Sequence, residues 1–268
     1  FLHICTYSHS QMAKRKKKAR IGKTVLIILI VLASVVTAIW MFNNYYYRPS
    51  FKHYAAFGID LPVAYGIHGV DVSHHQKNIS WKEVKKMEIN GVKIGFAFIK
   101  ATEGTDLIDE HFGKNWAKAQ NQKITKGAYH FFNATTNPAR QAKNFLQRVK
   151  LQPGDLPPVL DIEQDNGVAK ILIQQRVKEW LQLVEKEYNV QPIIYTNVDF
   201  YNRFLSPQFD GYPLWIAHYF ANGKPRIGRK WSFWQHSETG HVNGIDAFVD
   251  FNVFNGDSSA FKKLLLKE

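Results

Sequence analysis

Two carboxylates separated by one residue are the side chains in this sequence best suited to acid–base chemistry. Asp161 and Glu163 close the apolar run PPVLDIE, residues 157–163. Along a strand, residues i and i+2 point to the same face, with backbone positions about 6.6 Å apart. Two carboxylates on one face repel each other, so the pKa of the more enclosed one should rise. A protonated acid beside an ionised partner can cleave a glycosidic bond, whereas a solvated strand end or a salt bridge is the alternative explanation.

Two further acids are expected at the same edge. Asp71 lies in the run GVDVSHHQ, with Ser73 and His75 on its side of the strand, and Asp250 lies in GIDAFVDFNVF near the end of the chain. A single aspartate often caps a helix or binds backbone, so neither residue alone indicates a site. First, middle and last strands that all deliver an acid to one edge do indicate one.

Aromatic residues accompany these acids. Tyr129, Tyr195, Trp215 and Tyr219 lie at or near the ends of apolar runs. Sugars present flat apolar faces, so a carbohydrate cleft needs aromatic platforms together with polar groups. Packing in the core explains most aromatic residues in any sequence and is the alternative for each of them. The candidate substrate-binding residues are Tyr129, Tyr195, Trp215 and Gln235.

Metal and cofactor chemistry finds little support in the sequence. His74 and His75 are adjacent, so on a strand their rings would point to opposite faces, and Cys5 is the only cysteine. The sequence contains no H-E-x-x-H spacing and no glycine motif for phosphates or dinucleotides. We expect no metal and no cofactor, and hydrolysis of a glycan by carboxylates requires neither.

The candidate residues sit on an alternation of strands and helices. Short apolar runs predict strands at 69–73, 94–100, 126–132, 157–163, 192–197, 213–219 and 231–237. Between the early runs, Ser80 to Glu83 matches a capping box, Asn137 precedes a proline at a first helical position, and 168–188 is a long amphipathic stretch.

This alternation predicts an α/β fold with parallel strands. Seven or eight strands in about 200 residues fit a closed, TIM-like barrel better than an open sheet, and one transmembrane helix is expected at the N-terminus. The later connections are short, which indicates that the last strands lack full helices. Parallel barrels place their chemistry at the carboxyl ends of the strands, and the candidate residues cluster at the ends of the predicted runs.

The N-terminal part of the sequence predicts a membrane anchor. The 19 residues from Thr24 to Phe42 carry no charge, and about 17–25 apolar residues cross a bilayer as a helix. Seven basic residues between Lys14 and Lys23 precede this run, which predicts a cytoplasmic N-terminus and an exported remainder. A secreted protein, released by cleavage of a signal peptide after Val36-Thr37-Ala38, is the alternative.

The domains follow from these features. We expect a basic cytoplasmic segment (1–23), a transmembrane anchor (24–42), a linker (43–65) and a catalytic barrel (66–268). Residues 1–11 are expected to be upstream sequence read in frame, because Met12 stands directly before the basic cluster. The formal net charge of +13 does not indicate a nucleic-acid partner, because the positive-inside arrangement explains the cluster. We expect a monomer in the cytoplasmic membrane.

From about Gly66 to about Gly256 the chain resembles glycoside hydrolase family 25, the lysozymes first known from fungi, bacteria and phage. The motifs that carry the resemblance are, in order, GVDVSHHQ with a downstream ISW, FAFIKATEG, GAYHFF, PPVLDIE, PIIYTN, PLWIAHY, WSFWQHS and VDFNVF. No single motif is specific, but their common order is. One departure is visible, because many members have tryptophan where this chain has His75.

The resemblance implies a TIM-like barrel of eight strands with regular helices mainly on the first five. It also implies cleavage of the β-1,4 bond between N-acetylmuramic acid and N-acetylglucosamine in peptidoglycan. It implies that Glu163 is the general acid and that Asp161 orients or charge-stabilises the 2-acetamido group of the substrate, if that group attacks the sugar carbon. Asp71 and Asp250 match the acidic residues of the family, and Tyr129 matches its pocket tyrosine. The sequence leaves open whether configuration is retained or inverted.

Two other functions fit parts of the pattern. A chitinase-like glycosidase also ends a strand in D-x-E, but its signature requires an acid where this chain has Val159. A non-catalytic glycan-binding module on the same fold is the second alternative, although this chain retains every acid that the chemistry would use.

Overall fold

The computed structural model describes residues 22–41 and 50–267, which belong to two separate units. In the first unit, Gly22–Met41 form one helix with a mean hydropathy of 2.7. A helix of this length and composition is compatible with a signal anchor or with a signal sequence. The predicted span 24–42 coincides with this helix except at Phe42, which lies outside the described residues together with most of the basic cluster.

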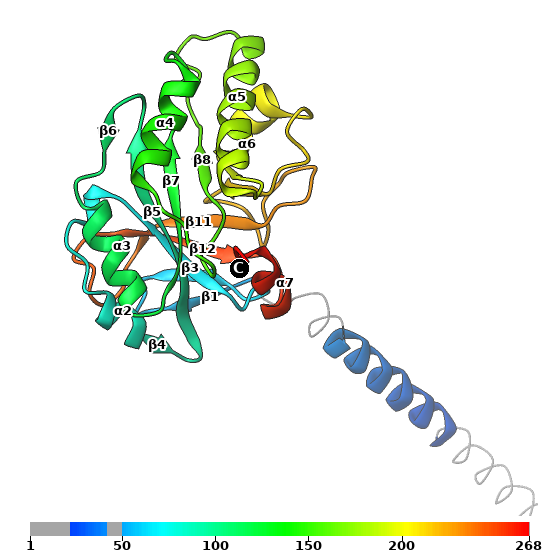
Figure 1. Ribbon diagram of the computed structural model, residues 1–268. Coiled ribbons are helices and arrows are strands. Elements are labelled where there is room, and N and C mark those ends of the chain that lie inside the picture. The colour runs from blue at the N-terminus through cyan, green and yellow to red at the C-terminus, as the bar shows by residue number, and fades with distance from the viewer. Residues whose placement is uncertain (1–21, 42–49, 268) are drawn as a thin grey trace, which may run out of the picture. The chain divides into compact units, whose positions relative to one another are not determined.

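The second unit is built on a closed barrel of eight strands (Figure 1). The strands are β3 (His68–Val72), β5 (Val92–Glu103), β7 (Thr125–Phe131), β8 (Val159–Asp161), β9 (Ile193–Asn197), β10 (Leu214–Ala217), β11 (Phe233–Gly240) and β12 (Val249–Phe254). The barrel closes because β3 pairs with both β5 and β12. This confirms the expected eight-stranded barrel and shows that every predicted apolar run contributes a strand.

The last strand runs in the opposite direction to the others. β12 is antiparallel to both of its neighbours, β11 and β3, whereas the remaining neighbours around the barrel pair in parallel. The expectation of an all-parallel, TIM-like barrel is therefore wrong at this strand. The reversal has a functional consequence, because it places Asp250, near the start of β12, opposite Asp71, near the end of β3.

Helices follow the first strands of the barrel. They are α2 (Trp81–Lys86), α3 (Phe112–Asn121), α4 (Pro138–Arg148) and α5 (Lys170–Tyr188). The connection after β9 holds only the short α6 (Val198–Phe200) and the π-helical turn η2 (Tyr201–Leu205). Between β10 and β12 the chain has no helix, and α7 (Ser258–Leu264) follows β12. Asn137 caps α4 as predicted, but the Ser80 side chain makes no capping hydrogen bond to α2, so the expected capping box does not form.

An N-terminal hairpin takes the place of the missing helices. Strands β1 (Phe51–Tyr54) and β2 (Ile59–Pro62) pair with each other. Phe51 packs edge-on against Trp234 of β11, with ring centroids 6.0 Å apart, and Phe57 packs against Phe251 of β12 at 5.3 Å. The linker expected over 43–65 is therefore wrong for its second part, because residues 50–65 belong to the folded unit.

The interior of the barrel is filled mainly by aromatic rings. Phe96, Phe98, Tyr129, Trp215 and Phe233 are the largest members of this cluster. Phe261 of α7 packs on Phe96 and Phe254 and closes the end of the barrel opposite to the carboxyl ends of the parallel strands. Space for the rings comes from two glycines, since a Cβ at Gly69 would lie 2.5 Å from Phe96 and one at Gly127 2.8 Å from Phe98.

The hairpin predicts a stability effect outside the catalytic residues. Phe57 is fully buried against Phe251, so Phe57→Ala should lower the free energy of unfolding by about 3–5 kcal/mol. Val63→Ala, at a residue that is 53% exposed, is the matched control and should change it by less than about 0.5 kcal/mol. Thermal unfolding of the full chain in detergent measures both, and equal stability of the two variants would contradict the assignment.

Candidate active site

At the rim of the barrel formed by the carboxyl ends of the parallel strands, the inward-facing positions hold polar side chains. Successive inward positions run from Phe98 to Lys100 on β5, from Val159 to Asp161 on β8 and from Phe233 to Gln235 on β11. On the antiparallel β12, the row runs from Phe254 back through Asn252 to Asp250. Because alternate residues of a strand share a face, these side chains all converge above the aromatic interior.

Asp71 is held at the centre of this rim by two amides. Its Oδ2 accepts hydrogen bonds from Gln235 Nε2 at 2.9 Å and from Asn252 Nδ2 at 2.7 Å. The oxygen of each amide is occupied by an aromatic donor: Tyr195 and Tyr219 hydroxyls donate to Gln235 Oε1, and Trp215 Nε1 donates to Asn252 Oδ1. These donors fix the orientation of both amides, so that each presents its NH₂ group to Asp71.

Asp161 is the last residue of β8, and Glu163 lies two residues beyond it. Asp161 is 6% exposed, and its Oδ1 has no hydrogen-bond partner among the described residues. Glu163 is partly exposed and receives a hydrogen bond from the side chain of Asn197, at the end of β9. The amide of Asn197 is oriented by its own oxygen, which accepts from the backbone N of Phe200 at 2.9 Å. The two carboxyls thus differ in environment, one enclosed and one open to solvent.

Burial raises the pKa values of all four carboxyls, and repulsion by neighbouring carboxylates adds to the rise for Asp161, Glu163 and Asp250. Desolvation is the largest cause for each, and it raises the pKa of Asp161 well above the ordinary value, with the charge of Glu163 next in importance. The pKa of Glu163 is raised by burial and by Asp71, against the hydrogen bond from Asn197. Asp250 is raised to about 9 by burial and by Asp71. Asp250 therefore keeps its proton at neutral pH, and the ionisation of each carboxyl depends on that of its neighbours.

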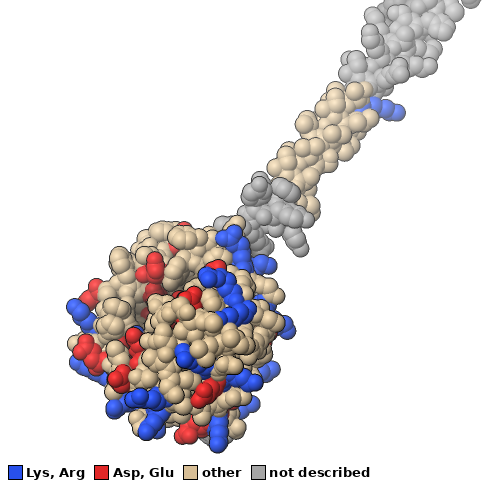
Figure 2. All heavy atoms as spheres, turned by 90° about the horizontal axis from the view of Figure 1, so that it is seen from above, with Lys and Arg blue, Asp and Glu red and all other residues tan. Residues whose placement is uncertain are grey.

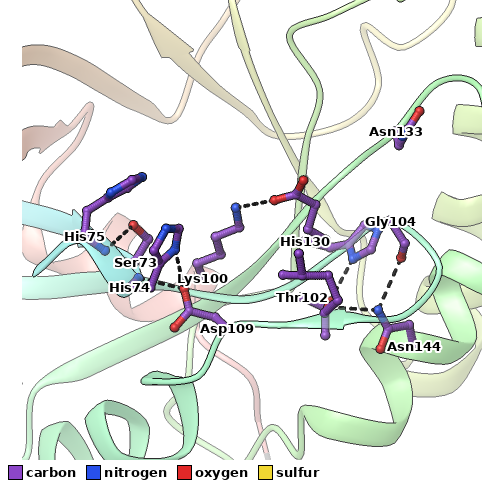
Figure 3. A network of polar contacts seen from close by, with 12 residues as sticks. Ser73, His74, His75, Lys100, Thr102, Gly104, Asp109, His130, Asn133 and Asn144 are labelled. Carbon is purple, nitrogen blue, oxygen red and sulfur yellow. Dashed lines mark hydrogen bonds and ion pairs between the residues drawn. The ribbon is translucent and has the colours of Figure 1, made fainter. Parts of the chain in front are cut away.

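One cation faces the acids. Lys100 lowers the pKa of Asp161, and its Nζ lies 2.7 Å from Glu103 Oε2. Figure 3 shows Lys100 extending between the His74–Asp109 contact and the buried Thr102–His130 pair. The chain after β3 is fixed by Asp109, whose Oδ2 accepts from the backbone N of His74 at 2.7 Å.

The structure brings the four predicted acids together and changes the role of other candidates. Trp215 and Gln235 are 1% and 2% exposed, so neither offers a surface to a sugar; both instead position Asp71. Tyr195 is likewise buried and donates to Gln235. Tyr129 lies under the acids, and burial together with the charges of Asp71 and Asp161 raises the pKa of its hydroxyl well above the ordinary value.

Sequence reasoning missed three polar residues of the site: Lys100, Asn197 and Asn252. Lys100 was detectable, because it extends the alternate row of Phe96 and Phe98 by one inward position. The two asparagines gave no signal that distinguishes them from turn or capping residues. Among the residues that the structure describes, no group of three or more His, Cys, Asp or Glu side chains is arranged to hold a metal ion.

The raised pKa of Asp250 predicts how stability depends on pH. Its folded pKa of about 9 exceeds the ordinary 3.8, so its contribution to stability is complete below the ordinary pKa and is lost as pH rises towards the folded value. Asp250→Asn removes this loss and should stabilise the protein by about 1–2 kcal/mol near pH 8, with a smaller gain near pH 4. The exposed Asp246→Asn is the control. Thermal unfolding at both pH values measures the effect, and an equal gain at both would contradict it.

Comparison with known proteins places this geometry in a family. Residues 70–245 match the model of glycosyl hydrolases family 25. The uncharacterized protein YegX of Escherichia coli strain K12 is 44% identical over 212 residues, which cover 79% of this chain and 76% of YegX. Lysozyme M1 of Streptomyces globisporus is 35% identical over 211 residues, covering 72% and 69% of the two chains.

Solved structures agree with the sequence comparison. A family 25 glycosyl hydrolase from Bacillus anthracis superimposes with a TM-score of 0.69 at 33% identity, covering 75% of this chain and 94% of the other. The lysozyme of Streptomyces coelicolor gives 0.66 at 32% identity, covering 75% and 97%. The chain therefore belongs to glycosyl hydrolases family 25 and is a glycoside hydrolase.

Proposed function

We propose that this enzyme hydrolyses the β-1,4 bond between N-acetylmuramic acid and N-acetylglucosamine in peptidoglycan, with Glu163 as general acid and Asp161 as its partner. The observation that carries the proposal is the pair itself, an enclosed carboxyl with a free oxygen beside a partly exposed carboxyl of raised pKa. The relatives named as lysozymes agree with the choice of peptidoglycan as substrate.

Glu163 has the properties of a proton donor. Its raised pKa keeps a proton on the carboxyl closer to neutral pH than an ordinary glutamate would, and general acids work best with a pKa near the working pH. The carboxyl is also the more accessible of the pair, so it can reach the oxygen of the glycosidic bond. Protonation of that oxygen lets the leaving sugar depart as an alcohol.

Asp161 has the properties of an orienting group. Its Oδ1 is buried without a partner among the described residues, and such a group is costly unless something binds it. An N–H group of the substrate satisfies it, and the 2-acetamido group of the sugar supplies one. Burial and Glu163 raise the pKa of Asp161, and Lys100 opposes this rise. When Asp161 is ionised, its charge stabilises the positive charge that develops as the acetamido oxygen attacks the sugar carbon.

Asp71 and Asp250 set the electrostatics of the pair. The charge of Asp71 raises the pKa of Glu163, of Asp161 and of Asp250. Asp71 keeps hydrogen bonds from two amides that favour its ionised form. We propose that Asp71 carries the negative charge of the resting site and that this charge keeps the proton on Glu163.

Removal of the proposed acid tests the function. Glu163→Gln keeps the size and the acceptor for Asn197 but has no proton to donate, so cleavage of peptidoglycan should fall by about 10²–10⁴-fold. The assay is release of glycans with muramic acid at the reducing end from purified peptidoglycan by the full chain, with far-ultraviolet circular dichroism as a control for folding. Full activity of the variant would remove Glu163 from this role. Cleavage of chitin without cleavage of peptidoglycan would favour a chitinase-like activity.

We also propose that the enzyme is anchored in the cytoplasmic membrane by Gly22–Met41 and acts on the wall outside it. All 22 acidic residues lie after residue 49, so residues 1–49 carry eight of the thirteen excess positive charges. On the face of the catalytic unit in Figure 2, both basic and acidic side chains are present. Confinement at the membrane restricts the enzyme to its own wall and suits growth, turnover or remodelling.

Membrane fractionation tests the anchor. We expect the full-length protein to stay in the membrane pellet after a high-salt wash and to dissolve in detergent, because an apolar helix is held by the hydrophobic effect and not by charge. Replacement of Ile30 by Arg should weaken this retention, since a charge at the centre of a bilayer costs about 2.5–3.5 kcal/mol or more. A shortened protein in the soluble fraction would instead show a cleaved signal sequence.

A further inference from the structure

A hollow of about 560 Å³ lies beside the acid cluster. Its walls come from the hairpin β1–β2, from the loop after β10 and from the outer part of β11, and none of the four acids lines it. Pockets of about 300–1,000 Å³ hold small ligands. The hairpin, which forms one wall, precedes residue 70, where the match to the family model begins. The hollow is thus built partly from a segment that this family match does not cover.

Tyr219 connects the hollow to the active site. Its ring lines the hollow, while its hydroxyl donates to Gln235 Oε1 at 2.9 Å, and Gln235 in turn holds Asp71. The charges of Asp250, Asp71 and Glu163 all raise the pKa of Tyr219, which places the ring close to the catalytic acids. A polymer bound across the acids can therefore extend into the hollow without leaving the protein surface.

The walls combine aromatic rings with neutral hydrogen-bonding groups. Phe51, Tyr219 and Phe220 supply the rings, and Phe220 is 94% exposed, so its faces are free to contact a ligand. Asn222 and Ser237 supply polar groups on the same walls. His53 and Asp60 also line the hollow, and they contact each other, with His53 Nδ1 and Asp60 Oδ1 2.8 Å apart. Flat apolar surfaces with neutral polar groups suit a sugar better than a charged peptide.

His236 adds a second, independent indication of a polar ligand. It lines the hollow and is 4% exposed, and neither of its ring nitrogens has a hydrogen-bond partner among the described residues. Burial lowers the pKa of His236 to about 3, so the ring is neutral and offers one donor and one acceptor. A hydroxyl group, which is itself both donor and acceptor, can pair with either nitrogen of such a ring, whereas a carboxylate can pair only with its N–H.

We propose that this hollow is a distal subsite that binds one N-acetylhexosamine unit of the glycan strand, beyond the sugars that contact the acids. The proposal rests on the proposed function, because it extends the same substrate along the surface. Phe220 and Tyr219 contact the faces of the sugar, and Asn222, Ser237 and His236 bind its hydroxyl and acetamido groups. The subsite selects long strands over short fragments, since only a long strand reaches both places.

Kinetics with two substrates test the subsite. For Phe220→Ala in the full chain, KM on long glycan strands stripped of their peptides should rise about three- to tenfold with kcat unchanged. KM on short oligosaccharides that span only the acids should stay the same. Asn222→Ala should act in the same direction. Leu183→Ala, an apolar residue on α5 that is 38% exposed and outside the hollow, is the control and should change neither value.

Three outcomes would overturn the subsite. They are unchanged KM on long strands, an equal rise on long and short substrates, and a rise seen only with strands that retain their peptides, which would assign the hollow to the stem peptide. Binding of peptide-free strands to Glu163→Gln, with and without Phe220→Ala, gives a readout that does not need cleavage. Failure of the wild-type chain to cut peptidoglycan would reject the proposed function, whereas normal cutting with no effect of Phe220 would reject only the subsite.

Discussion

Repulsion among carboxyls that share one water-poor rim is the constraint on which the rest of this site depends. Asp71, Asp161, Glu163 and Asp250 cannot all ionise together, because the charge of Asp71 raises the pKa values of the other three and the charge of Glu163 raises those of Asp161 and Asp250. The four carboxyls differ in how readily they ionise, because each has different hydrogen-bond donors. Asp71 has two amide donors, Glu163 has one, and one oxygen of Asp161 has none among the described residues. Unequal environments of this kind separate the roles of chemically similar acids.

The difference in hydrogen-bond partners among the carboxyls originates in the packing of the barrel interior. Trp215 stacks on Phe98 with ring centroids 4.3 Å apart, and this contact directs its N–H to Asn252. With its oxygen held by Trp215, Asn252 presents its NH₂ group to Asp71. A hydrophobic contact inside the barrel thus determines which carboxyl at the rim is stabilised as an anion. Enzymes whose acids are held this way accept lower stability in exchange for preorganised charge.

The sequence predicted the acids because their positions follow from simple periodicity. Asp161 and Glu163 share a face as alternate residues, and Asp71 and Asp250 end or begin runs that are plainly strands. The direction of β12 was missed, although Asn243-Gly244 in the loop 241–248 is a turn signal and no helix lies between β11 and β12. Trp215 was assigned to the wrong role for a related reason. Alternation shows that two residues share a face, but only the closed barrel shows whether that part of the face is filled by neighbouring rings.

The hairpin at residues 51–62 shows why the remaining part of the fold was missed. Its strands have four residues each, which is too short for an alternating pattern to differ from chance, and its Phe57 lies in the turn. The contacts that stabilise the hairpin are made with barrel residues outside it. The connections around β11 and β12 lack helices, so Trp234 and Phe251 would face water, and burial of these rings against Phe51 and Phe57 is what stabilises the hairpin. The absence of helices around β11 and β12 therefore explains why the hairpin covers this side of the barrel. It also explains why the hairpin forms one wall of the hollow beside the acids.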